Sequence, residues 1–319
     1  MPATSVDALS IVDCHYLLEG RAAAYLMIDG GEAAFFDNGT RFSVPYLLEE
    51  LAAKDMRPEE VRYIVVTHVH LDHCGGTAEL AKHCPNATIL AHPRAGRHIA
   101  DPRRLVAGAT EIYGAQRLLE IYGVVEPVDE ARIRTLEDES VVELGTRSLR
   151  FLHTPGHAKH HFAIHDATSN SVIAGDAFGL TYRQLDRDGK CYVGYVCSPP
   201  EFDPAAGKQS IRRILDTGAE RVFVTHFGEF SRLREGAEQL ARSLDNYDAA
   251  VNEAADGELT GQPLEDWCRE CAESIIVAEL RRSGLDPEDK EVAFWAKTEL
   301  MVSSKGLAFL ATRRRAPAP

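Results

Sequence analysis

The sequence lacks the segments that direct a chain out of the cytoplasm or into a membrane. Its first ten residues, MPATSVDALS, contain neither the basic region nor the apolar run of a signal peptide. No apolar run approaches the roughly 20 residues that a membrane-spanning helix needs. We therefore expect a cytoplasmic protein with no membrane partner.

Basic residues are also in short supply. The 319 residues include 35 Lys and Arg against 49 Asp and Glu, which gives a formal net charge of −14. Nucleic acid phosphates are bound by clustered Lys and Arg, so this balance disfavours nucleic acid as a partner. It does not exclude a local basic pocket.

The cysteines are few, scattered and odd in number, which argues against a disulfide framework. The seven are Cys14, Cys74, Cys84, Cys191, Cys197, Cys268 and Cys271. In a cytoplasmic chain we expect them to be reduced thiols. Cys268 and Cys271 form a Cys-x-x-Cys pair, but no second pair completes a zinc site. The sequence leaves open whether that pair, or Cys74, has a redox role.

The patterns that are present predict a layered fold. Segments 23–29 and 33–37 flank Gly30-Gly31 and predict a hairpin, and VRYIVVT (61–67) predicts a strand buried on both faces. Strand and helix patterns alternate to about residue 230. Beyond it the pattern is almost wholly helical, up to a tail, TRRRAPAP, that we expect to be solvated. We predict an α/β domain over residues 1–230 and a helical C-terminal extension over residues 231–319.

The most distinctive stretch is THVHLDHCGG, residues 67–76. It places His68, His70, Asp72 and His73 directly after the predicted strand. Imidazole nitrogens and carboxylate oxygens are the ligands that zinc, iron and manganese accept. Residues 68 and 70 can converge on one point, whereas residues 72 and 73 can face a second point. The spacing therefore predicts a site for two metal ions.

Four ligands cannot saturate two ions, so further ligands are expected elsewhere in the chain. His157 lies in a Pro-Gly loop after one predicted strand, Asp176 ends another, and His226 ends a third. In each case a candidate ligand follows a predicted strand, as it does in the motif at residues 68–73. The predicted metal site therefore involves several strands of the fold and not one local segment.

With these residues the sequence resembles the metallo-β-lactamase superfamily, whose signature His-x-His-x-Asp-His matches residues 68–73. The resemblance covers about residues 10–230 and implies a four-layer αββα sandwich of the α/β class. It implies that His68, His70 and His157 bind a first ion, that Asp72, His73 and His226 bind a second, and that Asp176 bridges both. Asp37, in FFDNG, matches a position that supports the metal-binding histidines in the family.

Such a site implies hydrolysis of a small-molecule substrate. Two divalent ions lower the pKa of a bound water from about 15.7 towards about 7, which makes a metal-bound hydroxide available at neutral pH. We expect it to attack an ester, thioester or lactone, with Asp176 positioning the nucleophile and Asp72 accepting its proton. Zinc is the first choice on ligand type, and iron or manganese is also accepted.

Other interpretations stay open. The alternatives are a metabolite-binding regulatory protein with little turnover, a phosphodiesterase, or a mononuclear-iron sulfur dioxygenase of the same superfamily. His161 with its neighbour His160, and also Tyr192 and Tyr195, are candidates for substrate contacts. The C-terminal helices are candidates for a homo-oligomer interface.

Overall fold

The computed structural model describes residues 9–186, 189 and 191–315. Residues 1–8, which make up most of the segment inspected for a signal peptide, and residues 316–319 of the tail lie outside the described residues. The strands are β1 (Leu9–Asp13), β2 (Ala23–Asp29), β3 (Glu32–Phe36), β4 (Val61–Val66), β5 (Thr88–Ala91), β6 (Ile133–Thr135), β7 (Val141–Leu144), β8 (Arg147–His153), β9 (Phe162–Asp166), β10 (Ser171–Gly175), β11 (Arg221–Val224) and β12 (Gly228–Phe230).

The α-helices are α1 (Val44–Ala53), α2 (Leu71–Cys74), α3 (Thr77–His83), α4 (Pro93–Ala100), α5 (Arg103–Tyr113), α6 (Ala115–Tyr122), α7 (Pro204–Asp216), α8 (Leu233–Asp256), α9 (Gly261–Arg282) and α10 (Lys290–Arg315). Short 3₁₀ turns are η1 (Arg41–Ser43), η2 (Pro58–Glu60), η3 (Glu130–Arg132) and η4 (Arg183–Leu185). Among the described residues, none of the helices combines the length and the apolar composition that crossing a lipid bilayer requires.

By packing, the chain divides into two compact units. The first comprises residues 1–153, 160–175 and 216–231, and the second comprises residues 154–159, 176–215 and 232–319. The first unit therefore contains β1–β12 and α1–α6, and the second contains α8, α9, α10 and nearly all of α7. The domain boundary at residue 230 stays a prediction.

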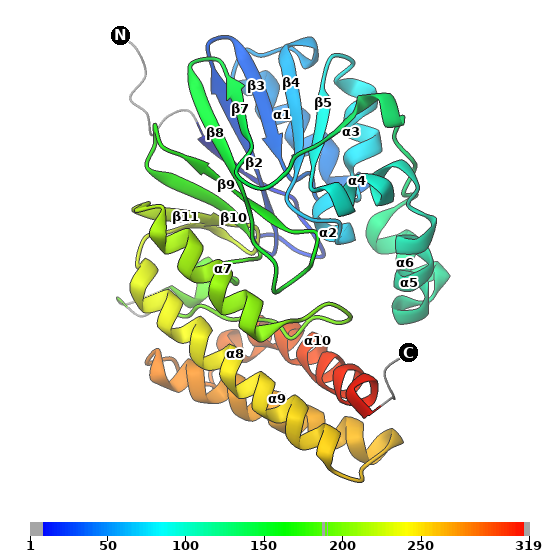
Figure 1. The fold of residues 1–319 in the computed structure, drawn as a ribbon, viewed down its shortest axis with the longest axis vertical. Helices are drawn as coiled ribbons and strands as arrows, with labels where there is room; N and C mark the ends of the chain where they lie inside the picture. Colours follow the sequence, from blue (N-terminus) through cyan, green and yellow to red (C-terminus); the bar gives the residue numbers. More distant parts are fainter. Residues whose placement is uncertain (1–8, 187–188, 190, 316–319) are drawn as a thin grey trace. The chain divides into compact units, whose positions relative to one another are not determined.

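Two mixed sheets, each of six strands among the described residues, form the first unit (Figure 1). The first sheet has the order β1-β2-β3-β4-β5-β6, and its neighbours from β3 to β6 run parallel. The second has the order β12-β11-β10-β9-β8-β7, with β10 and β11 parallel. The carboxyl ends of parallel neighbours meet at one edge of a sheet, so residues that follow β3 and β4 are brought together.

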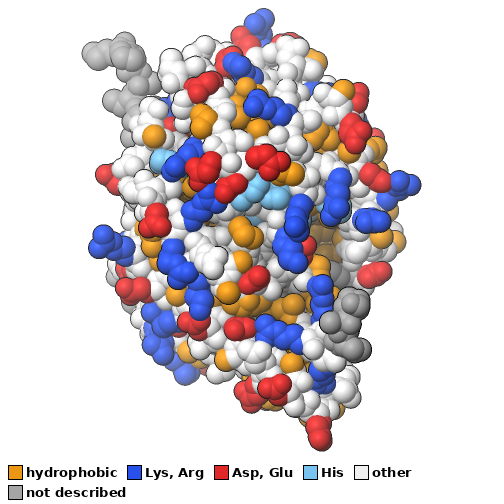
Figure 2. All heavy atoms as spheres, viewed as in Figure 1, with side chains coloured by type: hydrophobic (Ala, Val, Ile, Leu, Met, Phe, Trp, Pro, Cys, Tyr) orange, Lys and Arg blue, Asp and Glu red, His pale blue; other side chains and the backbone are white. Residues whose placement is uncertain are grey.

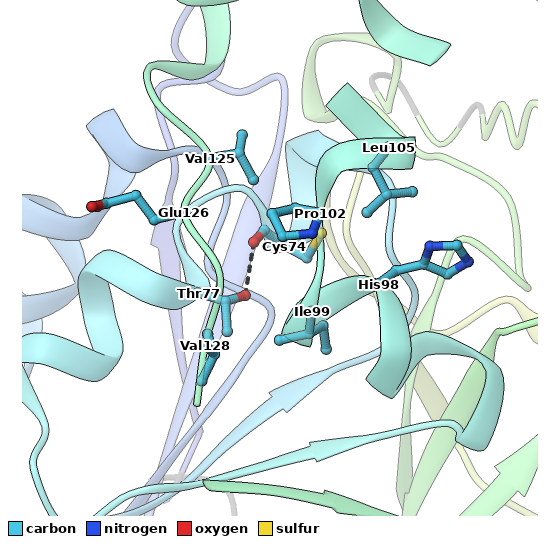
Figure 3. Close-up of a pocket in the computed structure, with 9 residues that line it drawn as sticks. All are labelled: Cys74, Thr77, His98, Ile99, Pro102, Leu105, Val125, Glu126 and Val128. Atoms are coloured by element: carbon cyan, nitrogen blue, oxygen red, sulfur yellow. Dashed lines mark hydrogen bonds between the residues drawn. The ribbon is translucent and has the colours of Figure 1, made fainter. Parts of the chain in front are cut away.

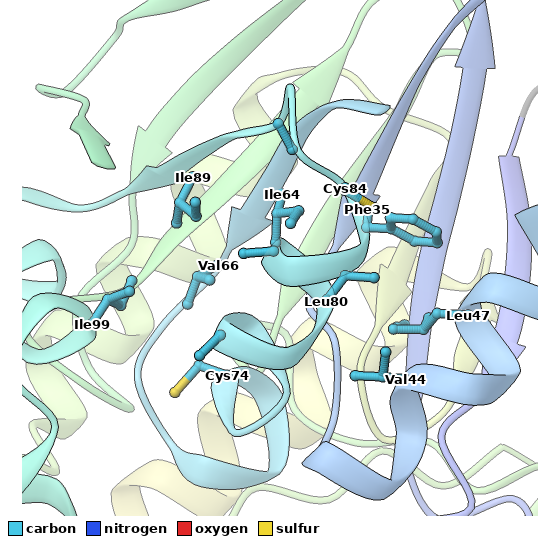
Figure 4. Packing of buried hydrophobic residues seen from close by; sticks show 14 of the residues in the cluster. Phe35, Val44, Leu47, Ile64, Val66, Cys74, Leu80, Cys84, Ile89 and Ile99 are labelled. Atoms are coloured by element: carbon cyan, nitrogen blue, oxygen red, sulfur yellow. The ribbon is translucent and has the colours of Figure 1, made fainter. Parts of the chain in front are cut away.

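The inner strands of the first sheet, β2 to β5, are largely buried on both faces, as predicted for VRYIVVT. In β4, Ile64 and Val66 face one hydrophobic core, and Tyr63 and Val65 face another. The first core lies between this sheet and helices including α1 and α3, as Figure 4 shows. The second core lies between the two sheets and contains the aromatic side chains Tyr25, Phe36, Phe151, Phe162 and Phe223. The residues beyond each strand end are therefore anchored from both sides.

In the second unit the long helices α8, α9 and α10 pack against one another (Figure 1). Polar side chains on their buried faces hold the segment 191–197. On α8, Gln239 accepts a hydrogen bond from the backbone N–H of Val193 at 3.0 Å and donates one to the carbonyl of Cys191 at 3.1 Å. On α10, the hydroxyl of Ser303 accepts from the N–H of Cys197 at 3.2 Å. The helices thus fix the segment that carries Tyr192 and Tyr195.

The described part of the tail is helical. Thr312, Arg313 and Arg314 are exposed, as expected, but Arg315 is half-buried. α10 continues to Arg315, whose guanidinium donates to the carbonyls of Ala255 at 3.1 Å and Leu259 at 2.6 Å. It also donates to the carbonyl of Ala254. The last carbonyls of a helix have no partner within it, so these bonds satisfy the end of α8. The sequence did not indicate this because the acceptors are backbone groups about 60 residues away.

The remaining elements follow the sequence pattern closely. β2 and β3 pair antiparallel around Gly30-Gly31, so the predicted hairpin is observed. None of the seven cysteines, all of which lie in the described part of the chain, is in a disulfide, as expected. Burial raises the pKa of the thiols of Cys14 and Cys74, which keeps both protonated at neutral pH.

Candidate functional site

Several predicted site residues follow strand ends at one edge of the first unit. Asp37 directly follows β3, His68 lies two residues after β4, and His226 lies two residues after β11. The two sheets are joined at this edge, where the N–H of Phe162, on β9, donates to the carbonyl of Thr67 at 3.0 Å. Histidines from separate sheets are thereby held on one framework.

Asp72, His73 and His226 form a compact group in the first unit. One ligand atom of each lies within 4.8 Å of those of the other two. Asp72 Oδ2 is 3.7 Å from His73 Nε2 and 3.5 Å from His226 Nε2. His73 is buried, whereas the Asp72 side chain keeps 20% of its surface exposed. The group is therefore reachable from solvent through the carboxylate.

The far nitrogens of the two imidazoles are fixed by other groups. His73 Nδ1 lies 3.3 Å from Asp37 Oδ2, and His226 Nδ1 lies 2.8 Å from the carbonyl oxygen of Arg21. A carboxylate or carbonyl on one nitrogen is the usual way in which a metal-binding histidine is oriented, because it leaves the other nitrogen as the ligand. The residues present therefore fit a divalent metal ion beside Asp72.

His68 and His70 form the adjacent part of the group. Their nitrogens His68 Nε2 and His70 Nδ1 face each other at 3.0 Å, and His68 Nδ1 lies 3.1 Å from the hydroxyl of Thr67. His68 is buried and His70 is half-buried. The spacing of two residues thus turns one nitrogen of each ring towards a shared point, as the sequence predicts.

Asp37 is the hub of the hydrogen bonds beneath the histidines. Its Oδ1 accepts from the N–H of Thr67 at 2.8 Å, and its Oδ2 accepts from the hydroxyls of Thr67 at 2.8 Å and Thr225 at 3.2 Å. Asp37 is buried and has a backbone φ of +57°, a conformation that aspartate adopts more readily than most residues. These contacts are those of a supporting residue, the function that the resemblance implies for Asp37.

The carboxylate of Asp72 is stabilised as an anion. Burial opposes its ionisation, but the neighbouring imidazoles of His73 and His226 outweigh burial and hold the pKa of Asp72 well below its usual range. Asp72 is therefore ionised at neutral pH, the form needed both to bind a cation and to accept a proton.

His157 and Asp176 belong to the second unit, where His157 Nε2 lies 3.4 Å from Asp176 Oδ2. The loop that carries His157 is fixed by backbone contacts. The carbonyl of Gly156 accepts from the N–H of Asp203 at 2.8 Å, and the carbonyl of Pro155 accepts from the hydroxyl of Ser210 at 2.6 Å. The predicted ligand set is thus divided between the two units.

The two tyrosines singled out in the sequence differ in their surroundings. Both are buried. Tyr192 donates its hydroxyl hydrogen to Glu299, on α10, at 2.7 Å. The hydroxyl of Tyr195 has no hydrogen-bond partner within the described part of the chain. Burial and then the charge of Asp176 raise the pKa of Tyr195, so its hydroxyl stays protonated as a donor. Tyr195 is therefore the better candidate for a substrate contact.

The adjacent histidines His160 and His161 also differ. His161 is fully buried, with its Nε2 against Gly175 and its ring 4.9 Å from that of His68. This burial favours a supporting position over the predicted contact with substrate. His160 is half-buried, and its ring lies 6.3 Å from that of His68 and 6.0 Å from that of His70.

Two threonines beneath the site were not singled out from the sequence. Thr67 and Thr225 each precede a site histidine, and each hydroxyl donates to Asp37. The sequence carries a signal for both, because VVTH and FVTH repeat the order strand, threonine, histidine. A hydroxyl at that position points back under the strand end, where a buried carboxylate needs a donor.

Comparison with known proteins agrees with this geometry. The family model described as the metallo-beta-lactamase superfamily matches residues 17–226. The metallo-beta-lactamase fold-containing protein ST1585 of Sulfurisphaera tokodaii is 25% identical over 199 residues, which are 61% of this chain and 70% of that protein. The acyl-coenzyme A thioesterase MBLAC2 of Gallus gallus is 29% identical over 190 residues, which are 57% of this chain but only 61% of that protein.

Solved structures show the same fold. The crystal structure of ST1585 from Sulfolobus tokodaii gives a TM-score of 0.65 at 20% identity and covers 94% of this chain and 98% of that one. The metallo-beta-lactamase family protein TTHA1429 from Thermus thermophilus gives a TM-score of 0.62 at 20% identity, covering 96% and 94%. The predicted α/β sandwich with C-terminal helices is confirmed. On its sequence and its fold, the chain belongs to the metallo-β-lactamase superfamily.

Proposed function

We propose that the protein is a metal-dependent hydrolase that acts on small esters or thioesters. The observation that carries this proposal is the group Asp72, His73 and His226. Asp37 and the backbone carbonyl of Arg21 each lie at Nδ1 of one imidazole, and Nε2 of each ring faces the carboxylate of Asp72. Membership of a superfamily whose matched relatives include proteins named as hydrolases supports it.

The proposed ligand set has two halves. His68, His70 and His157 would hold one ion, and Asp72, His73 and His226 the other, with Asp176 between them. Chain connectivity supports the contribution of the second unit. His157 is three residues from His160, whose ring lies near those of His68 and His70, and Asp176 is bonded to the last residue of β10. Zinc suits these donors best, with iron or manganese as alternatives.

The chemistry divides between the ions and the chain. Two divalent ions, when bound, activate water at neutral pH and polarise a carbonyl oxygen. We assign to Asp72, which is ionised, the acceptance of a proton from the attacking water, and to Tyr195 the donation of a hydrogen bond to the substrate. In thioester hydrolysis the water oxygen bonds to the acyl carbon, the carbon–sulfur bond breaks, and the departing sulfur takes a proton.

Among these substrates we put acyl-coenzyme A thioesters first. The relatives named MBLAC2 from Gallus gallus, Bos taurus and Homo sapiens are described as acyl-coenzyme A thioesterases. Their identity to this chain, 27% to 29%, makes a thioester the natural first substrate to assay and leaves the acyl group undetermined.

The test combines metal content with turnover. After metal-replete expression, elemental analysis should give about two ions per chain, and less than about one would contradict the proposal. A panel of esters, thioesters, lactones and phosphodiesters should reveal turnover that disappears in Asp72→Ala. Asp129→Ala serves as a matched control. Asp129 is exposed and caps the turn η3, so its replacement removes one carboxylate without touching the candidate site and should leave turnover unchanged. Tight binding of a metabolite without turnover would support a regulatory protein instead.

A further inference from the structure

An acidic protein carries one short basic segment beside its candidate site. Residues 94–104 read RAGRHIADPRR and include four arginines, one histidine and a single carboxylate, in a chain of formal net charge −14. The arginines are Arg94 and Arg97 on α4, and Arg103 and Arg104 at the start of α5. We call these four residues the α4–α5 basic cluster.

The cluster stands on a fixed helix. The opposite face of α4 is buried. Ala95 and Ile99 belong to the first hydrophobic core, and a Cβ on the buried Gly96 would lie 2.8 Å from the Thr135 side chain on β6. Ile99 lines a pocket with Leu105 and other apolar side chains (Figure 3). Arg94 and Arg97 are three residues apart on the exposed side, so they lie on the same face of the helix.

Most of this positive charge is not neutralised by the protein. Asp101 pairs with Arg103 through two hydrogen bonds, at 2.7 and 2.5 Å. Among the described residues, no carboxylate lies within ion-pair distance of Arg94, Arg97 or Arg104. All three are exposed. In a chain with an excess of acidic residues, three guanidinium groups within eleven consecutive residues, none paired with a carboxylate in the described part of the chain, make this segment locally positive.

The cluster is close to the candidate metal ligands. The ring of His98, adjacent to Arg97 on α4, lies 6.5 Å from the ring of His160. His160 in turn lies 6.0 Å from the ring of His70. Arg97 Nε donates to His98 Nε2 at 3.4 Å. This hydrogen bond connects the cluster to His98, the first of the three imidazole rings His98, His160 and His70. Figure 2 shows Lys and Arg side chains close to histidine side chains on the viewed face.

We infer that the α4–α5 basic cluster binds the phosphate groups of a small substrate whose scissile thioester or ester bond lies at the metal ligands. This inference rests on the proposed function. Guanidinium groups hold phosphate oxygens through paired, charge-assisted hydrogen bonds. Three unneutralised cations match a ligand with two or more negative charges, whereas a single carboxylate would engage one of them. The phosphates belong to the leaving group of a thioester such as an acyl-coenzyme A.

The experiment uses the full-length, metal-loaded protein and two butyryl thioesters, one of coenzyme A and one of pantetheine. They share the acyl group and the thiol arm, but only the first carries phosphates. In Arg94→Ala/Arg97→Ala, KM for the coenzyme A thioester should rise about ten-fold. The kinetic constants for the pantetheine thioester should not change. Arg94→Lys/Arg97→Lys should restore part of the affinity, because lysine keeps the charge and loses the paired geometry.

Arg269→Ala/Arg281→Ala, on α9, is the matched control, since it removes the same charge from exposed positions. It should leave both substrates unaffected. The difference between wild type and Arg94→Ala/Arg97→Ala should also shrink as salt is raised from about 0.05 to about 0.5 M, because salt screens exposed charges. An equal KM for the coenzyme A thioester in wild type and Arg94→Ala/Arg97→Ala would overturn the inference and leave the proposed function standing.

A binding measurement separates the two proposals. Calorimetry with free coenzyme A, pantetheine and inorganic phosphate needs no turnover. If no ester or thioester is hydrolysed, yet coenzyme A binds wild type and not Arg94→Ala/Arg97→Ala, the proposed function fails and phosphate binding by the cluster holds. If coenzyme A binds both proteins equally, the cluster is not its site. Tighter binding of a short oligonucleotide than of coenzyme A would also overturn the inference.

Discussion

The carboxylate of Asp37 accepts two hydrogen bonds from Thr67, one from its N–H and one from its hydroxyl, each at 2.8 Å. Thr67 directly precedes His68, and the same carboxylate lies 3.3 Å from His73 Nδ1. One buried side chain from the end of β3 therefore sets the position of the histidine motif that follows β4. The motif supplies the candidate ligand atoms, and Asp37 orients the side chains that carry them.

Replacing Asp37 with asparagine should weaken metal binding without unfolding the protein. The amide in Asp37→Asn would keep the shape but lose the charge that holds His73 Nδ1, so we expect the affinity for zinc to fall about 10–100-fold. Competition with a coloured chelator measures this directly. Asp129→Asn, at an exposed turn, is the control, and zinc affinity in Asp37→Asn equal to that of the control would contradict the prediction.

The two tyrosines should respond oppositely to loss of the hydroxyl. Tyr192→Phe removes the hydroxyl that donates to the buried carboxylate of Glu299, so the free energy of unfolding should fall by about 1–3 kcal/mol. Tyr195→Phe removes a hydroxyl with no partner in the described chain, so stability should change little while kcat/KM falls. Denaturant titration of both variants measures the free energy of unfolding, and steady-state kinetics measures kcat/KM. An active, destabilised Tyr195→Phe would reverse the assignment.

Gly156 should tolerate no side chain. Its backbone φ is +136°, and a Cβ there would lie 2.3 Å from the Cα of Gly207 on α7. Strain and overlap together predict that Gly156→Ala lowers the free energy of unfolding by about 2–6 kcal/mol. Gly218→Ala is the matched control, with a φ of +76° and open space around it, and should cost about 1 kcal/mol. Chemical denaturation measures both free energies of unfolding. Equal decreases in Gly156→Ala and Gly218→Ala would show that the loop around Gly156 can shift to accommodate a methyl group.

His92 should make stability depend on pH. Burial, followed by the nearby His153 and Arg94, lowers its pKa from 6.5 to about 4, and Asp138 acts weakly in the other direction. The unfolded chain therefore binds more protons between these values, so the stabilising contribution is complete above pH 6.5 and is lost as pH falls towards 4. The loss amounts to at most roughly 3 kcal/mol, and solvent screening brings it below that ceiling.

His92→Asn isolates this effect. The His92 side chain accepts a hydrogen bond from the N–H of Arg94 at the start of α4, and asparagine can do the same without titrating. The melting temperature of His92→Asn should therefore fall less than that of wild type between pH 7 and pH 4.5. If the melting temperatures of wild type and His92→Asn fall equally as the pH is lowered, the loss of stability in acid is due to groups other than His92.

The sequence predicted the parts of the site that depend on spacing along one strand end. Buried β-branched residues fix β4, and the alternation after it places His68 and His70 together. What it could not resolve was orientation. In the sequence His160 and His161 are equivalent neighbours, yet in the structure His160 is half-buried and His161, directly before β9, is fully buried. Tyr192 and Tyr195 also read alike, and only the packing of α10 shows that Glu299 engages the first.

Contacts between distant segments were likewise hidden. The sequence suggests that Arg315 belongs to a solvated charged tail. Its hydrogen-bond acceptors are backbone carbonyls near the end of α8, and these cannot be predicted from a pattern of side chains. The basic cluster was visible only as a local excess over an acidic background. Its nearness to the histidines came from the positions of His98 and His160.

The cysteine thiols differ in burial, which allows one of them to be labelled selectively. Six of the cysteines are buried, and Cys271 on α9 is the partly exposed one. Alkylating reagents attack the exposed thiolate form, so a maleimide dye should attach at Cys271 without mutagenesis. A fluorescent reporter could then be installed on the natural sequence, with the candidate metal-binding histidines left unmodified.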